Sequence, residues 1–98
     1  MTFDEIYNRF SSANAVVPGK KVKFDFGDVG KIFLDGAAGK VSNEDAAADT
    51  TIKIKLEDFI AMAGGTLDPT AAFMQGKLKV EGDMGVAMQL QSVMAKLR

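Results

Sequence analysis

The chain has 98 residues, with twelve basic and thirteen acidic side chains and a formal net charge of −1. This length fits one small domain, and we expect residues 1–98 to form it. The absence of cysteine and histidine excludes disulfides, thiolate nucleophiles, histidine triads and the metal sites that need these residues. The near-neutral charge gives no basic footprint for nucleic acid. We therefore expect no metal, no cofactor and no nucleic-acid partner.

The first predicted element is a helix that begins after Thr2. Thr2 and Glu5 have the spacing of a capping box, and Met1 and Ile6 have that of a hydrophobic staple. The predicted helix presents one apolar face, made of Phe3, Ile6, Tyr7 and Phe10. Such a stripe usually covers a core, and the alternative is a lid or a membrane anchor. We expect the helix to end near residues 12–14.

Residues 21–55 have the pattern of four strands. Apolar and charged residues alternate over 21–26, 31–35 and 50–55, and a short strand is expected at 40–42. Glycine-containing turns at 27–30 and 35–39 separate the first three strands, and a polar loop at 43–49 precedes the fourth. This pattern predicts an antiparallel meander with one apolar face and one face of mostly lysine and aspartate.

The remaining residues return mainly to a helical period. A helix is expected over 56–63, and Asp68 and Pro69 predict the start of a short helix ending near residue 75. A strand at 77–81 must join the earlier strands, and Asp83 is expected to cap a final helix that reaches Leu97. The predicted fold is α+β, a five-stranded, mainly antiparallel sheet with helices covering one face.

Several segments between residues 49 and 91 resemble the sterol-carrier-protein family of lipid-binding domains. They are Asp49-Thr50-Thr51-Ile52, Glu57-Asp58-Phe59, Asp68-Pro69, AFMQGKLKV at 72–80 and EGDMGVAMQLQ at 81–91. The resemblance implies an apolar ligand tunnel between sheet and helices, and binding of fatty acids, fatty acyl-CoAs or sterols. It also implies that some members are fused to enzymes of lipid oxidation. The chain ends in Lys96-Leu97-Arg98 and not in a peroxisomal Ser-Lys-Leu, so we expect a cytoplasmic protein.

Methionine and phenylalanine are the residues that we expect to divide between core and tunnel. Methionine is unbranched and repacks around ligands of different shape, and five of the six methionines fall in the C-terminal half. The alternative for each strand residue is a plain core position, and Gln91 or Gln75 could hydrogen-bond a lipid headgroup. The predicted tunnel lining is Phe24, Phe26, Ile32, Leu34, Ile52, Ile54, Phe59, Met62, Phe73, Met74, Leu78, Val80, Met84, Met88, Leu90, Gln91 and Met94.

These observations predict a lipid-binding and lipid-transfer domain without catalysis. The alternative is a noncatalytic accessory module that presents a lipid-like substrate to a partner enzyme; an enzyme that uses Tyr7 or a buried carboxylate is the least favoured reading. The strand lysines are expected to form a solvated face, or else to contact an anionic membrane transiently during delivery. They are Lys20, Lys21, Lys23, Lys53, Lys55, Lys77 and Lys79.

Overall fold

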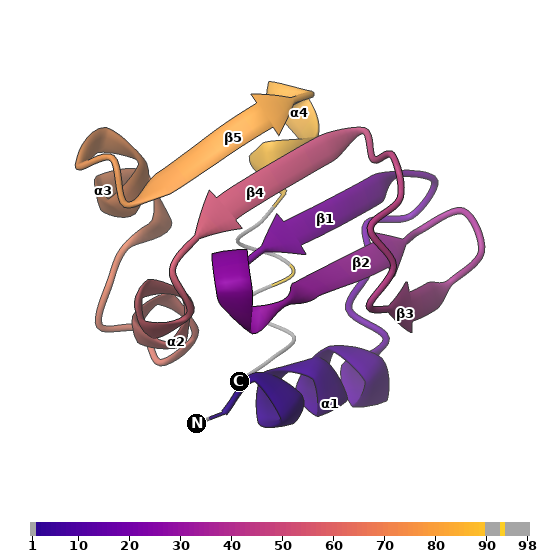
Figure 1. Cartoon of the computed structure of the whole chain (residues 1–98). Helices are drawn as coiled ribbons and strands as arrows, with labels where there is room; N and C mark the ends of the chain where they lie inside the picture. The colour runs from indigo at the N-terminus through magenta and orange to yellow at the C-terminus, as the bar shows by residue number, and fades with distance from the viewer. Residues whose placement is uncertain (1, 90–92, 94–98) are drawn as a thin grey trace.

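A computed structural model describes residues 2–89 and residue 93 (Figure 1). The elements are α1 (Phe3–Ala13), β1 (Lys21–Asp25), the 3₁₀ turn η1 (Gly27–Val29), β2 (Lys31–Asp35), β3 (Lys40–Ser42), β4 (Thr50–Ile54), α2 (Leu56–Ala63), α3 (Pro69–Met74), β5 (Leu78–Gly82) and α4 (Met84–Ala87). Their order confirms the prediction, and the bounds differ by a residue or two except at the last helix, which is predicted to reach Leu97, whereas α4 ends at Ala87. Met1 of the predicted staple lies outside the described residues, as do residues 90–92 and 94–97 of the predicted final helix. None of the helices in the described part of the chain is long and apolar enough to cross a membrane.

The five strands form one open sheet in the order β3-β2-β1-β4-β5. Three neighbouring pairs are antiparallel, while β1 and β4 run parallel, with Phe24 opposite Ile52. The α+β class and the mainly antiparallel sheet are therefore confirmed. The antiparallel meander over residues 21–55 is wrong at its last strand, because β4 pairs with β1 and β5 and not with β3. Alternation identifies a strand and its faces, but it does not identify the neighbouring strand or its direction.

A crossing loop, residues 43–49, carries the chain from β3 across β2 and β1 to β4, and it lies over the polar face of the sheet (Figure 1). The side-chain amide of Asn43 donates to the carbonyl of Lys31 at 2.9 Å. At the other end, the amide of Asp49 donates to the carbonyl of Lys21 at 2.8 Å, and the amide of Lys21 donates to Asp49 Oδ2 at 2.8 Å. Hydrogen bonds at both ends thus hold the loop against the strands.

The crossing loop explains why one large apolar side chain is buried on the face that the sequence predicts to be polar. Phe33 is 3% exposed, although it shares this face with its register partner Lys23. Lys23 Nζ lies 2.8 Å from Asp45 Oδ1 of the loop, and Lys31 Nζ lies 3.8 Å from the other oxygen of the same carboxylate. The hydrogen bond and the charge of Lys23 lower the pKa of Asp45. The pattern correctly places Phe33 on the face opposite Ile32 and Leu34, but it does not predict that the side chain is buried there.

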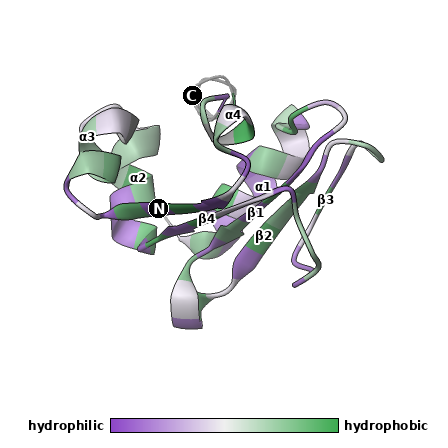
Figure 2. Cartoon of the chain, turned by 90° about the horizontal axis from the view of Figure 1, so that it is seen from above, coloured by the Kyte–Doolittle hydropathy of each residue, from purple (hydrophilic) through white to green (hydrophobic). Residues whose placement is uncertain are grey.

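The main core lies on the opposite face of the sheet, under the helices. The Phe24 ring of β1 lies 5.3 Å from the ring of Phe10 in α1 and 5.4 Å from the ring of Phe59 in α2. Tyr7 of α1 donates its hydroxyl hydrogen to the carbonyl of Val41 in β3 at 3.1 Å. Figure 2 views the molecule from above and shows α1 and α4 on the same side of the strands. This arrangement leaves the polar face to the crossing loop and the strand lysines.

Candidate functional site

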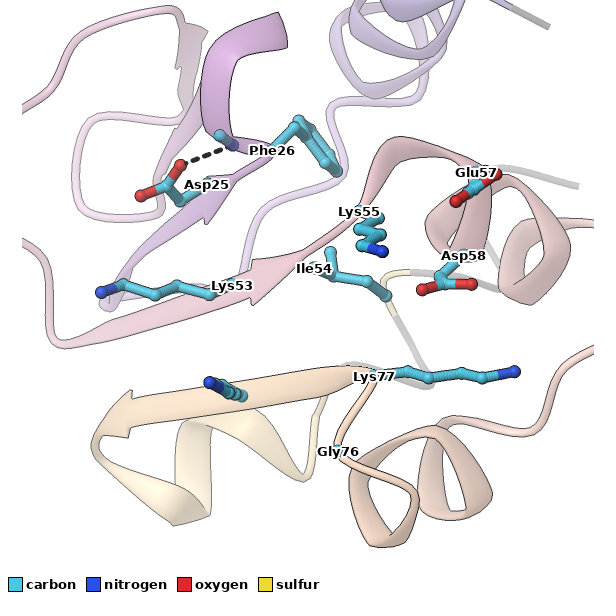
Figure 3. A pocket seen from close by; sticks show the side chains of 11 residues that line it. Asp25, Phe26, Lys53, Ile54, Lys55, Glu57, Asp58, Gly76 and Lys77 are labelled. Atoms are coloured by element: carbon cyan, nitrogen blue, oxygen red, sulfur yellow. Dashed lines mark hydrogen bonds between the residues drawn. The ribbon is translucent and has the colours of Figure 1, made fainter.

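A hollow of about 650 Å³ opens at the carboxyl ends of β1 and β4 (Figure 3). It lies between the end of β1, the start of α2 and the turn that leads into β5. Phe26 and Ile54 belong to the buried core and also line the hollow, so the core reaches the surface here. The residues that line the hollow are Asp25, Phe26, Gly27, Lys53, Ile54, Lys55, Glu57, Asp58, Gly76, Lys77 and Lys79.

Three lysines of this rim have no ion-pair partner among the residues that the structure describes. In the described part of the chain, no carboxylate oxygen lies within 4 Å of the Nζ atoms of Lys55, Lys77 and Lys79. Lys53 differs, because its Nζ lies 2.7 Å from Glu81 Oε1 on the neighbouring strand. That hydrogen bond and the charge of Glu81 raise the pKa of Lys53. The rim therefore offers three cationic groups that are available to a bound anion.

Three carboxylates also line the hollow, and two of them, those of Asp25 and Glu57, have local structural roles. Asp25 Oδ1 accepts a hydrogen bond from the amide of Gly27 at 2.9 Å and so fixes the turn after β1 (Figure 3). Glu57 lies in the first turn of α2, where the helix dipole favours an acid, and Asp58 follows it. The hollow is thus mixed in charge, with carboxylates at the starts of η1 and α2 and lysines along β4 and β5.

A second, shallower hollow of about 480 Å³ adjoins the first and shares Phe26, Lys55 and Glu57 with it. Its remaining lining is mostly apolar and consists of Asp28, Val29, Leu56 and Ile60. Val29 of this lining has 51% of its surface exposed. Together the two hollows join an apolar surface to a lysine-bearing rim, which suits a ligand with an apolar body and an anionic end.

Most of the predicted tunnel residues from the sheet and α2 lie together in the buried interior. The rings of Phe24, Phe26 and Phe59 contact one another, with centroids 5.2 to 6.2 Å apart. Val80 is half-buried at the edge of the same group. The buried members of the predicted lining are Phe24, Phe26, Ile32, Leu34, Ile52, Ile54, Phe59, Met62 and Leu78. The structure brings them together, and their contact with a ligand remains a prediction.

The predicted lining residues from the later helices lie elsewhere. Phe73 and Met74 of α3 are 45% and 80% exposed, and Met84 and Met88, in and after α4, are 50% and 80% exposed. Gln75 follows α3 and is also exposed. The other three predicted residues, Leu90, Gln91 and Met94, lie outside the described residues. The structure therefore does not gather the exposed members with the buried group.

The lysine rim was not predicted as a site, because the sequence pattern treats its lysines as a solvated strand face. The missing information was the pairing of β4 with β5, which sets Ile54 opposite Leu78. With that register, Lys55 leaves β4 at the point where Lys77 enters β5. The signal available in the sequence was the Lys-Ile-Lys of 53–55 and the Lys-Leu-Lys of 77–79, two matching segments that an antiparallel pairing brings together.

A five-stranded sheet with helices on its apolar face, and a hollow beside a charged rim, defines a small α+β domain. The model of the SCP-2 sterol transfer family matches residues 8–95, and the chain belongs to that family. Hydroxysteroid dehydrogenase-like protein 2 from Danio rerio is 43% identical over 67 residues, which cover 66% of this chain. The matched segment is 16% of the zebrafish protein, so the chain spans a small part of this relative.

Solved structures from Aedes aegypti share the fold. Sterol carrier protein 2 in complex with the C16 fatty acid palmitate aligns with a TM-score of 0.79 and 22% identity, covering 97% of this chain and 96% of the insect protein. The palmitated SCP2L2 protein aligns with a TM-score of 0.71 and 28% identity, covering 96% of this chain and 95% of the other. The first likeness supports the fold, and the second connects the fold to a relative that carries a fatty acid.

Proposed function

We propose that this domain binds and transfers a lipid with a long apolar chain and an anionic head, without chemistry of its own. The observation that carries the proposal is the continuity of the buried core with the lysine-rimmed hollow at Phe26 and Ile54. Membership of the SCP-2 sterol transfer family and the likeness to a palmitated insect protein support it.

Apolar burial supplies the main driving force in this proposal. A sixteen-carbon chain that is fully buried gains on the order of 12 kcal/mol, at roughly 0.8 kcal/mol per methylene. Lost translational freedom and ordering of the chain offset much of this gain. In the proposed complex the chain enters past Phe26 and Ile54 and lies against the apolar face of the sheet, where the predicted tunnel residues are. No nucleophile, metal or cofactor is needed for this function.

The rim lysines orient the ligand. Lys55, Lys77 and Lys79 line the same hollow as the core residues Phe26 and Ile54, so an anionic head at the rim leaves the chain directed at the core. Lys55 is the most central of the three because it lines both hollows. An ion pair at such a solvent-exposed site is worth about 1 kcal/mol or less, so the rim selects orientation more than it adds affinity.

Displacement of a fluorescent fatty acid by palmitate and by 1-hexadecanol tests both parts of the proposal. We expect both competitors to displace the probe, because burial of the chain is common to them. Lys55→Gln should weaken palmitate about fivefold, corresponding to ~1 kcal/mol, and leave hexadecanol unchanged. Lys40→Gln is the matched control, since Lys40 is an exposed lysine of β3 at the other edge of the sheet.

The two parts of the proposal fail separately. If neither competitor binds to the folded protein, lipid binding itself is refuted. If Lys55→Gln weakens the acid and the alcohol equally, or neither of them, the chain binds but the rim does not hold its head.

A second function is supported by the zebrafish relative, of which this chain spans 16%. In that reading the domain presents a lipid-like substrate to a partner enzyme and does not carry lipid between membranes. Transfer of a fluorescent fatty acid between donor and acceptor vesicles distinguishes the two functions. A carrier accelerates transfer by itself, whereas a presenting module binds the lipid and leaves the transfer rate at its spontaneous value.

A further inference from the structure

The two ends of β5 carry equally exposed methionines in opposite electrostatic surroundings. Met74 ends α3, before the strand, and Met88 follows α4, after it; both side chains are 80% exposed. Figure 1 shows α3 and α4 at opposite ends of β5. Residues 73–79 contain two lysines and no acid, whereas residues 81–89 contain two acids and no base. An exposed methionine therefore lies in a lysine-containing segment at one end of β5 and in a segment with two acids at the other end.

The turn between α3 and β5 holds Lys77 close to the end of α3. The amide of Gly76 donates to the carbonyl of Phe73 at 3.2 Å, and the amide of Lys77 donates to the carbonyl of Ala72 at 2.9 Å. The reversal requires a φ of 76° at Gly76, a conformation that glycine adopts without steric cost. Ala72 is buried and anchors α3, while Phe73 and Met74 are exposed. Lys77 is thereby held beside the helical turn that carries the two exposed apolar side chains.

Two further lysines extend this surface along the sheet. Lys79 lies opposite Lys53 in the pairing of β5 with β4, and Lys55 follows the last residue of β4. We call Lys55, Phe73, Met74, Lys77 and Lys79 the basic tip. Acidic residues also lie near this surface. Glu81 of β5 pairs with Lys53, and Asp68 accepts hydrogen bonds from amides at the start of α3. Glu57 and Asp58 of α2 line the same hollow as the three lysines.

We propose that the basic tip docks on an anionic lipid bilayer. Exposed apolar side chains beside lysines are what an anionic interface binds, because the apolar groups enter the headgroup region while the lysines face the lipid phosphates. The first helix is a poorer candidate for this surface, since Asp4 and Glu5 occupy its first turn. Lys55, Lys77 and Lys79 also line the hollow, so docking brings its mouth to the membrane.

Vesicle flotation of the full chain tests this proposal, with phosphatidylcholine vesicles that contain or lack phosphatidylglycerol. We expect binding that requires phosphatidylglycerol and weakens as salt is raised, because screening shortens the range of the lysine charges. Lys77→Gln combined with Lys79→Gln should lower the partition coefficient about 25-fold, at roughly fivefold per lysine. Met74→Ser should lower it about tenfold through lost apolar contact.

Matched variants separate this surface from general effects of charge and hydrophobicity. Met88→Ser removes an equally exposed methionine from the acidic end, and it should leave vesicle binding unchanged. Lys20→Gln combined with Lys40→Gln removes the same charge from exposed positions before β1 and in β3. Because that change lowers the net charge as much as the tip variant does, a much smaller loss of binding is expected. Thermal midpoints confirm that each variant is folded.

Three results would overturn the proposal: no vesicle binding, equal binding with and without phosphatidylglycerol, or equal losses for Met88→Ser and Met74→Ser. The measurement involves no carried lipid, so its failure leaves the proposed lipid binding intact. Conversely, a tip that binds vesicles in a protein that displaces no fatty-acid probe refutes the carrier and retains the docking surface.

Discussion

Phe59→Ala tests the packing of the apolar interior on which the proposed ligand site depends. Phe59 is fully buried in α2, and its ring lies 5.2 Å from that of Phe26, 5.4 Å from Phe24 and 5.7 Å from Phe10. Removing the ring leaves a cavity among three aromatic neighbours that are themselves fixed by strands and a helix. Substitutions of this kind cost about 3–5 kcal/mol. For a domain of this length, that loss lowers the thermal midpoint by roughly 12–40 °C.

Urea unfolding followed by circular dichroism measures this loss, and Phe73→Ala is the matched control. The same atoms are removed from α3, where the ring is 45% exposed, so we expect a cost of about 1 kcal/mol or less. Phe59→Leu keeps most of the volume and should cost less than about 1.5 kcal/mol, which keeps the comparison measurable if the alanine variant unfolds. Equal costs for Phe59→Ala and Phe73→Ala would refute the close packing of the four rings.

Two further predictions concern the frame that holds the site. Gly36→Ala should cost more than ~4 kcal/mol in urea unfolding, because an added Cβ overlaps the carbonyl oxygen of Val17; Gly39→Ala, at a φ of 67° in open space, should cost about 1–2 kcal/mol. Lys23 lowers the pKa of Asp45, so their interaction stabilises the fold above the ordinary carboxyl pKa near 4 and is lost as the pH falls through the lowered value. The stability difference between the wild type and Asp45→Asn should therefore be constant near neutral pH and shrink below about pH 4, and a difference that persists at pH 2 would contradict the assigned pair.

Local sequence signals were sufficient for most elements because each signal acts within a few residues. Thr2 accepts the amide hydrogen of Glu5, as the capping box predicts, and Asp68 and Asp83 accept amide hydrogens at the starts of α3 and α4. The alternation over β1 and β4 placed Phe24 and Ile52 on the apolar face of the sheet, and both side chains are buried. In each case the deciding interaction is local: a hydrogen bond to the backbone at a helix start, or the burial of one face of a strand.

Long-range features could not be predicted because the same local pattern is compatible with several arrangements. The alternation around Phe33 places it on the polar face, but it does not show that a loop lies over this face or that Phe33 is buried there. The lysines of the rim look identical to solvated strand residues until β4 and β5 are paired in register. Helical spacing correctly placed the exposed Met74 in a helix, whereas the exposed Met88 follows the end of α4. For neither residue could the spacing tell a ligand-facing side from a solvent-facing side.

The parallel pairing of β1 with β4 at the centre of the sheet connects two features that the sequence did not predict, the crossing loop and the lysine rim. Because β1 and β4 run parallel, their carboxyl ends lie at the same edge, yet the chain leaves β1 through η1 toward β2 and leaves β4 into α2. Segments that diverge from adjacent parallel strands leave a crevice between them, as at the ligand sites of open α/β sheets. If β4 ran antiparallel to β1, its amino end would lie beside the carboxyl end of β1, and α2 would begin at the opposite end of the strands. The crossing loop is therefore a condition for the hollow, although none of residues 43–49 lines it.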